Sequence, residues 1–367
     1  MIHRYPLKIN VRLADQKTFL PITLRCSGNR IVDIDCHFAD RLRNIQLVTD
    51  CDPEQALFPY PHRSIKLELL DLYLAQCRLI ESHFQWTVPA YAGLIRSLLM
   101  ELHRLLNHYH FFLALAMATE FPKLIRNALS GRTAVYRLLR EIQSHAVTND
   151  FFILGGIARD LPTGFLEKVL QTVTAMQIRL KPIENQLRKR TIFSNQLEKI
   201  GIISREETTM WQLSGPNRQA CDPLLSAGLP ASNAANSQKK IRLILHSKGV
   251  PGDAWHRTWV RLQEIRQSLY TTHNLVQEIF KTEIALSTPF HIGRQHIDIT
   301  TDFSSAEGTV KCHITRNPGE KSFAGSYQYP AVNIISHLGL LLRGQRISDA
   351  GIIISSLNLN PIKHHIE

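Results

Sequence analysis

The stretch GDAWHRTWVRLQEIRQSLYTTHNLVQEIF, residues 252–280, has the spacing of one long helix. Asp253 predicts its N-cap, because a carboxylate there accepts the free backbone N–H groups of the first turn. At about 100° per residue, one face of this helix collects large apolar side chains. Arg266 and His273 fall in the middle of that face, so a buried cation there needs a partner. The apolar residues of the face are Trp255, Trp259, Leu262, Leu269, Val276 and Phe280.

Composition indicates a globular protein with a substantial core. The chain has 367 residues, of which 44% are hydrophobic and 20% charged. Its 6 cysteines form no C-x-x-C pair, so we expect a reduced compartment and no zinc or iron–sulfur site. The N-terminus lacks an apolar signal-peptide core, and the apolar run from Leu105 is too short to span a bilayer. We expect neither a signal peptide nor a transmembrane helix.

The net charge of +12 raises nucleic acid as a partner, because clustered Lys and Arg neutralise phosphates. The densest basic runs, residues 179–190 and 238–242, lack the interleaved aromatic side chains of a base-stacking surface. A nucleic-acid-binding protein is therefore the least favoured function class. A solvated face, or a surface that matches acidic neighbours, is preferred.

Secondary-structure patterns predict an α+β fold. The segments 7–13 and 31–38 alternate apolar and polar residues around a Gly/Asn turn, which indicates a small antiparallel sheet. Helical spacing begins at Ser64 and recurs over 92–119, with a limit at Pro122, and then over 132–145 and 163–189. It begins again at Ser204, where Glu207 completes a capping box. Strands are predicted at 296–303 and 308–316, then a helix at 333–342 and an apolar strand at 351–359.

These elements predict three parts of the chain. Residues 1–62 form an N-terminal antiparallel β domain, and residues 63–288 form a helix bundle. A loop excursion near 226–250 interrupts the bundle, with its most polar stretch at 228–238. Residues 289–367 form a C-terminal α/β segment.

No motif for self-contained catalysis is present. The sequence lacks a G-x-G-x-x-G loop, a P-loop, an H-E-x-x-H pair and a G-x-S-x-G elbow. His108 and His110 point to different sides of their predicted helix, so they do not predict a shared metal. We therefore assign neither a metal site nor a catalytic residue from motifs.

Several segments together resemble the D subunit of NADH-quinone oxidoreductase, a relative of the [NiFe]-hydrogenase large subunit. They are LHRLLNH (102–108), GGIARDLPTGFLEKV (155–169), IGIISREE (200–207), LSGPNRQA (213–220), GDAWHRTWVRLQEIRQSL (252–269) and RGQRISDAGIIISSLNL (343–359). The resemblance implies a hydrogenase-large-subunit-like fold with a small β domain, a central helix bundle and a C-terminal α/β part. Because this chain lacks paired cysteines, the resemblance does not extend to a nickel–iron centre.

The resemblance implies a place in a respiratory-type complex. In that family the subunit binds no cofactor itself, and it forms a quinone cavity with a partner subunit that holds an iron–sulfur cluster. It implies further partner subunits and peripheral association with a membrane through them. The expected location is the cytoplasmic face of a bacterial inner membrane, or the matrix face of a mitochondrial one.

The family's quinone-site residues are largely replaced here. Leu13 and Lys17 align with the histidines of its N-terminal loop, Ala118 with the acidic residue that supports the quinone histidine, and Thr148 with a histidine near the cluster. Leucine cannot supply a proton to a quinone.

Other positions that the resemblance singles out are candidates for the quinone pocket or match structural residues of the family. Gln76 aligns with the quinone-binding tyrosine, and it can hydrogen-bond a carbonyl oxygen without releasing a proton. Tyr73 lies nearly one turn earlier. With Arg104 and His108 these residues form the candidate quinone pocket. Structural matches to the family are Asp160, Asp253, Arg266 and Asp349.

Two readings follow from these residues. In the first, the chain is a working subunit whose pocket is remodelled by Tyr73, Gln76 and His108. In the second, it is a catalytically degenerate paralogue that serves as a scaffold for an iron–sulfur partner in another membrane-associated complex. Under both, Arg266 is expected to be buried against a carboxylate, with Glu101 or Glu207 as the named partners, and His273 is expected to be a core or interface histidine.

Overall fold

A computed structural model describes residues 4–12, 19–35, 45–49, 70–142, 151–222, 249–289, 296–319 and 323–359. The helices are α1 (Leu70–His83), α2 (Ala90–Ala118), α3 (Pro122–Ile142), α4 (Phe165–Arg188), α5 (Ile192–Leu197), α6 (Arg205–Met210), α7 (Gly215–Cys221), α8 (Ala254–Ile279), α9 (Pro330–Leu342) and α10 (Ile347–Leu357). The strands are β1 (Arg4–Arg12), β2 (Phe19–Ser27), β3 (Arg30–Asp35), β4 (Ile45–Thr49), β5 (Phe152–Ile153), β6 (Gly156–Ile157), β7 (Ile297–Ser304), β8 (Thr309–Arg316) and β9 (Phe323–Gln328).

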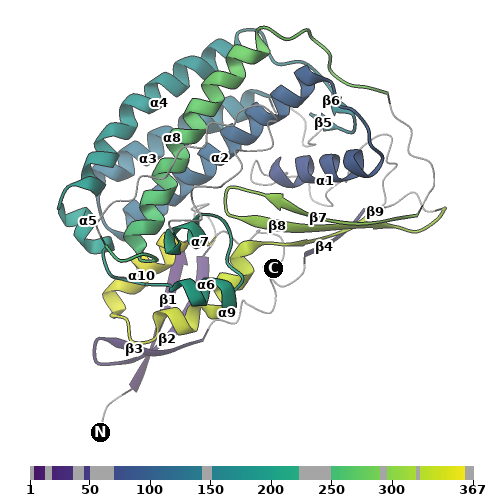
Figure 1. Ribbon diagram of the computed structural model, residues 1–367. Helices are drawn as coiled ribbons and strands as arrows, with labels where there is room; N and C mark the ends of the chain where they lie inside the picture. Colours follow the sequence, from purple (N-terminus) through teal and green to yellow (C-terminus); the bar gives the residue numbers. More distant parts are fainter. Residues whose placement is uncertain are drawn as a thin grey trace.

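Four long helices, α2, α3, α4 and α8, form the bundle at the centre of the molecule (Figure 1). Helix α8 packs against both α2 and α4, and α3 packs against α2 and α4. Trp255 and Trp259 of α8 stack with ring centroids 5.5 Å apart, and the indole N–H of Trp255 donates to the backbone oxygen of Leu187 in α4. Because α8 is covered on several sides, its first half is buried almost all round.

Two antiparallel sheets flank this bundle. Strands β1, β2 and β3 form one sheet, with a Gly-Asn turn between β2 and β3. The other sheet has the order β4-β9-β8-β7, so a strand from the first fifty residues pairs with the C-terminal part. Helix α1 contacts both α2 and this second sheet, and α10 contacts α2 and α8.

The predicted α+β class is confirmed. The predicted strands at 296–303 and 308–316 match β7 and β8, and the capping box of Ser204 and Glu207 is present at α6. Pro122, predicted to limit a helix, is the first residue of α3, a position that tolerates its missing N–H. The predicted loop at 228–238 and the predicted helix start at Ser64 lie outside the described residues.

The predicted strand at 351–359 is wrong, because these residues belong to α10 and its C-cap. The run of Ile352, Ile353 and Ile354 suggested a strand, since β-branched residues favour strands. Helix α10 packs against α2, α8 and α9, so these three isoleucines on successive sides are all buried. A helix that is buried on several sides lacks the polar face whose spacing makes a helical period recognisable in the sequence.

A buried ion pair joins α1 to α2. Arg96 donates from two guanidinium nitrogens to the Glu81 carboxylate at 2.8 and 2.7 Å, and both residues are almost fully buried. Arg96 also donates to the backbone oxygens of Ile153 and Gly156, and Glu81 accepts the backbone N–H of Gly155. The pair therefore fixes the β5–β6 hairpin to both helices, with its polar atoms well satisfied.

None of the helices in the described ranges combines the length and the apolar composition needed to cross a bilayer.

Replacing Arg96 with Met is expected to lower the free energy of unfolding by about 3–5 kcal/mol, because it leaves the Glu81 carboxylate buried without its cation. The double variant Arg96→Met, Glu81→Leu should lose less than the sum of the two single variants. A double-mutant cycle of urea unfolding measures this coupling. Additive losses would contradict the pairing.

Candidate functional site

The candidates Tyr73 and Gln76 lie on α1, at its contact with the second sheet. Both side chains are buried. The Gln76 amide donates a hydrogen bond to the hydroxyl of Tyr327 in β9. The Gln76 carbonyl oxygen is also buried, and it accepts no hydrogen bond from the residues that the structure describes. Gln76 thus keeps an acceptor free while its donor is bound.

Tyr327 is a site residue that the sequence did not reveal. Its hydroxyl also forms a hydrogen bond with Cys312 of β8. Burial raises the pKa of Cys312 to about 12, and the hydrogen bond with Tyr327 opposes this only in part. The cysteine is therefore a neutral thiol at neutral pH, and Gln76, Tyr327 and Cys312 form one uncharged group beneath α1.

The candidates Arg104 and His108 lie on α2 and face α8. His108 is fully buried, with its Nε2 atom 3.2 Å from an oxygen of Glu264. Arg104 is half-buried, and its Nε atom lies 4.0 Å from a Glu101 oxygen. With Arg261 of α8 these residues form the α2–α8 polar cluster, defined as Glu101, Arg104, His108, Arg261 and Glu264. Both helices supply its charges.

Burial sets the protonation states in this cluster. Desolvation raises the pKa of Glu264 to about 7, although the charges of Arg104 and Arg261 and a hydrogen bond from Gln219 oppose the shift. Desolvation, followed by the charges of Arg261 and Arg104, lowers the pKa of His108 well below its ordinary value. At neutral pH His108 is therefore neutral, and Glu264 titrates.

Two fully buried arginines of α8, Arg257 and Arg261, were also missed by the sequence analysis. Arg257 donates to Ser356 Oγ of α10 at 3.0 and 2.8 Å, and to the backbone oxygens of Gly201 and Gly252. Burial lowers its pKa to about 10. These neutral acceptors take the place of a carboxylate, because the guanidinium can spread its N–H donors over several oxygens.

Arg261 is held differently. None of its three guanidinium nitrogens has a hydrogen-bond partner among the described residues. Its guanidinium carbon instead lies 4.6 Å from the ring centroid of Phe111 in α2, a cation–π contact. Burial lowers its pKa to about 10, and the carboxylates of Glu264 and Glu307 oppose that shift.

The predictions for Arg266 and His273 need correction. The Arg266 side chain is 45% exposed rather than buried, and it pairs with Glu184 of α4 at 3.2 Å rather than with Glu101 or Glu207. His273 is exposed on this chain and does not lie in the core. Phe280, also placed on the apolar face, is 52% exposed. The stripe itself stays buried as far as Val276, and the exposed residues lie at its edge and at the C-cap of α8.

The other family-matching residues have local structural roles. Asp253 is the N-cap of α8, and its carboxylate accepts N–H bonds from His256, Lys199 and Val250. Asp160 accepts a hydrogen bond of 2.7 Å from the Tyr91 hydroxyl. Asp349 lies in the first turn of α10, where a negative charge favours the helix dipole.

Of the replaced family positions, Leu13, Lys17 and Thr148 lie outside the described residues, and Ala118 is the last residue of α2. Two pockets lie between α3 and α4, and neither is lined by a candidate quinone-pocket residue. Among the described residues, no group of three or more His, Cys, Asp or Glu side chains is arranged to hold a metal ion.

Comparison with known proteins places the chain in a class. Residues 124–300, from α3 to the start of β7, match the family described as the respiratory-chain NADH dehydrogenase 49 Kd subunit. The D subunit of NADH-quinone oxidoreductase from Bacillus thuringiensis subsp. konkukian is 25% identical over 307 residues, which cover 83% of this chain and 82% of the relative.

Relatives with the same name from other bacteria have similar sequence identity and coverage. The Bacillus anthracis protein is 25% identical over 307 residues, with the same coverage. The Methylacidiphilum infernorum protein is 25% identical over 325 residues, covering 82% of this chain and 77% of the relative. The chain is thus similar, over most of its length, to proteins named as the D subunit of NADH-quinone oxidoreductase, the family that its sequence motifs resemble.

Glu264 is expected to make the stability of the protein depend on pH. Its carboxyl holds a proton in the folded chain at pH values where the unfolded chain has released it, so its contribution to stability falls as pH rises from about 4.5 to about 7. When the pH is raised from 6 to 8, the free energy of unfolding should fall by about 1.4 kcal/mol less in the Glu264→Gln variant than in the unmodified protein.

Urea unfolding at several pH values measures this difference. The exposed Glu167 of α4, changed to Gln, is the control and should leave the profile unchanged. His108, Glu101, Arg104 and Arg261 also face Glu264, and they remain in both proteins being compared. Parallel pH profiles for the unmodified protein and Glu264→Gln would contradict the raised pKa.

Proposed function

We propose that this chain is a subunit of an NADH-quinone oxidoreductase or a related membrane-associated electron-transfer complex, where it forms the scaffold of the quinone module beside an iron–sulfur subunit. The observation that carries the proposal is the match to these oxidoreductase subunits over more than three quarters of both chains. The hydrogenase-large-subunit-like fold, the partner subunits and the location at the cytoplasmic or matrix face of a membrane belong to this proposal. The chain itself is expected to bind no metal or cluster.

The geometry around Gln76 favours a working quinone site over a purely structural role. Gln76 occupies the position that the resemblance assigns to a quinone-binding tyrosine, and the Tyr327 hydroxyl contacts it. Glutamine cannot release a proton, but the phenol beside it carries an O–H group. In the proposed site the Gln76 carbonyl oxygen accepts a hydrogen bond from the reduced headgroup, while the Gln76 amide N–H group donates to the Tyr327 hydroxyl.

The competing proposal is a catalytically degenerate scaffold. It is supported by the replacement of the family's proton-donating side chains at Leu13, Gln76 and Thr148. The degenerate scaffold is a structural subunit of another membrane-associated complex, and it differs from the first proposal in that no quinone is reduced at α1.

Purification of the tagged full chain from membranes of its own cells tests the assembly. We expect an iron–sulfur subunit and membrane subunits to copurify, and electron paramagnetic resonance of the purified sample to report a cluster. The same tag on an unrelated protein of those cells is the control. Recovery of the chain alone, with no cluster signal, would contradict the proposal.

Quinone reduction by the purified assembly tests the site. Gln76→Leu and Tyr327→Phe should each lower the rate by about tenfold or more with assembly intact, because each removes a polar contact in a water-poor site. The exposed Gln177 of α4, changed to Leu, is the matched control and should retain full activity. An intact assembly whose rate neither variant changes would favour the scaffold.

A further inference from the structure

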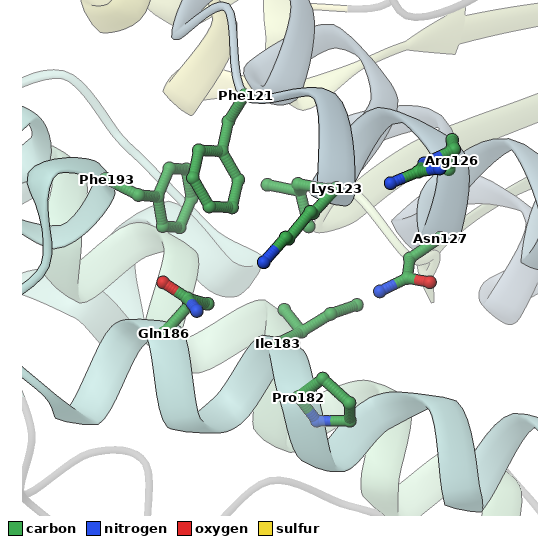
Figure 2. Close-up of a pocket in the computed structure, with 9 residues that line it drawn as sticks. Phe121, Lys123, Arg126, Asn127, Pro182, Ile183, Gln186 and Phe193 are labelled. Carbon is green, nitrogen blue, oxygen red and sulfur yellow. The ribbon is translucent and has the colours of Figure 1, made fainter.

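A groove with a basic rim runs between α3 and α4, on the outside of the bundle and away from α1. It consists of a cavity of about 270 Å³ and a larger one of about 630 Å³, which share Arg126 in their walls. Phe121 and Phe193 stack at one end with ring centroids 5.3 Å apart. Figure 2 shows Lys123 and Asn127 pointing from α3 toward Ile183 and Gln186 of α4 across the smaller cavity.

The rim of this groove carries one sign of charge. We define the basic groove by its four exposed cations, Lys123, Arg126, Arg137 and Arg179, above a buried floor that includes Leu124, Met176 and Ile183. Among the described residues that line the two cavities, none is acidic. Within the part of the chain that the structure describes, none of these four cations has a carboxylate at ion-pair distance.

Two acidic residues of the two helices, Glu141 and Glu184, form ion pairs outside the groove, and the third, Glu167, lines neither cavity. Glu141 of α3 pairs with Lys168, and Glu184 of α4 pairs with Arg188 and Arg266. The groove therefore combines an apolar floor with cations that no carboxylate among the described residues neutralises. An occupant that matches both features is amphipathic and negatively charged.

We propose that the basic groove docks an acidic amphipathic helical segment of a partner protein. The groove extends from Phe121 to Arg137 along α3, a span of about 24 Å at 1.5 Å per residue, which suits a helix of four to five turns rather than a small anion. Apolar side chains of the segment enter the two cavities, and its carboxylates meet the arginines at the rim.

Two other occupants fit less well. A second copy of this chain would bring the same cations to the same face, so like charges oppose a symmetric contact. A bilayer presents a broad flat surface, whereas these cations border two cavities in a row. The proposal does not depend on the quinone site, because no residue of that site lines the groove.

Binding of a fluorescent peptide to the full chain tests this proposal. The probe is an amidated peptide of about 18 residues, built from Leu, Ala and Glu, with Leu at the i, i+3, i+4 and i+7 positions of a helix. Fluorescence anisotropy should report saturable binding that weakens as salt is added. A peptide of the same composition with its leucines scattered around the helix should bind at least about fivefold more weakly.

Charge-reversal variants assign the binding to the groove. Arg126→Glu combined with Arg137→Glu should weaken binding by about tenfold or more. The exposed Lys181 of α4, which lines neither cavity, is the matched control, and Lys181→Glu should change the affinity less than about twofold. Circular dichroism confirms that each variant is folded.

The following results would overturn the proposal. They are no peptide binding, equal losses in the groove and control variants, or equal binding of the scattered peptide. Binding to vesicles that contain phosphatidylglycerol would also overturn it, if the groove variants abolish that binding and the peptide does not compete. That result would assign the groove to a lipid surface.

Discussion

The burial of two arginines on α8 is the constraint on which the rest of the structure depends. An isolated buried charge costs several kcal/mol, so each guanidinium must be stabilised by its surroundings. Arg257 requires the backbone oxygens of Gly201 and Gly252 and the hydroxyl of Ser356, which fixes two loops and α10 against the start of α8. Gly252 has a φ of 87° and no room for a Cβ atom beside Ile203, so only glycine presents its oxygen in this way.

Arg261 extends the same constraint to α2. Its guanidinium lies against the ring of Phe111, and Glu264 supplies a negative charge whose own pKa is raised by burial. His108 stays neutral beside this carboxyl. Ionisable groups are thus buried around α8 although no carboxylate among the described residues forms an ion pair with Arg257 or Arg261. The uncharged group of Gln76, Tyr327 and Cys312 lies on the other side of the architecture, where α1 meets the second sheet.

Local patterns were sufficient for much of the fold. The capping box of Ser204 and Glu207, the apolar alternation of β7 and β8 and the spacing of α2, α4 and α8 depend on neighbouring residues, so they could be predicted from the sequence. Local patterns failed for α10, which is covered on several sides, and for Arg266, which is exposed and pairs with Glu184 of another helix.

The site was predicted only in part, for a similar reason. Gln76 and His108 could be named from the resemblance, but Tyr327 and Arg261 meet them only through tertiary packing. Gln76 and Tyr327 are 251 positions apart in the chain, so no local pattern relates them. An arginine on a long helix is usually solvated, and the sequence has no local sign that Arg257 and Arg261 are exceptions.

An electron cryo-microscopy map of the assembly purified with this chain, with a quinone analogue added, tests the central claim most directly. We expect the cluster-bearing subunit to pack against this chain, and density for the analogue to lie within hydrogen-bond distance of Gln76. A chain outside any iron–sulfur assembly, or an analogue bound with Gln76 and Tyr327 sealed away from it, would rule out a working quinone site at α1.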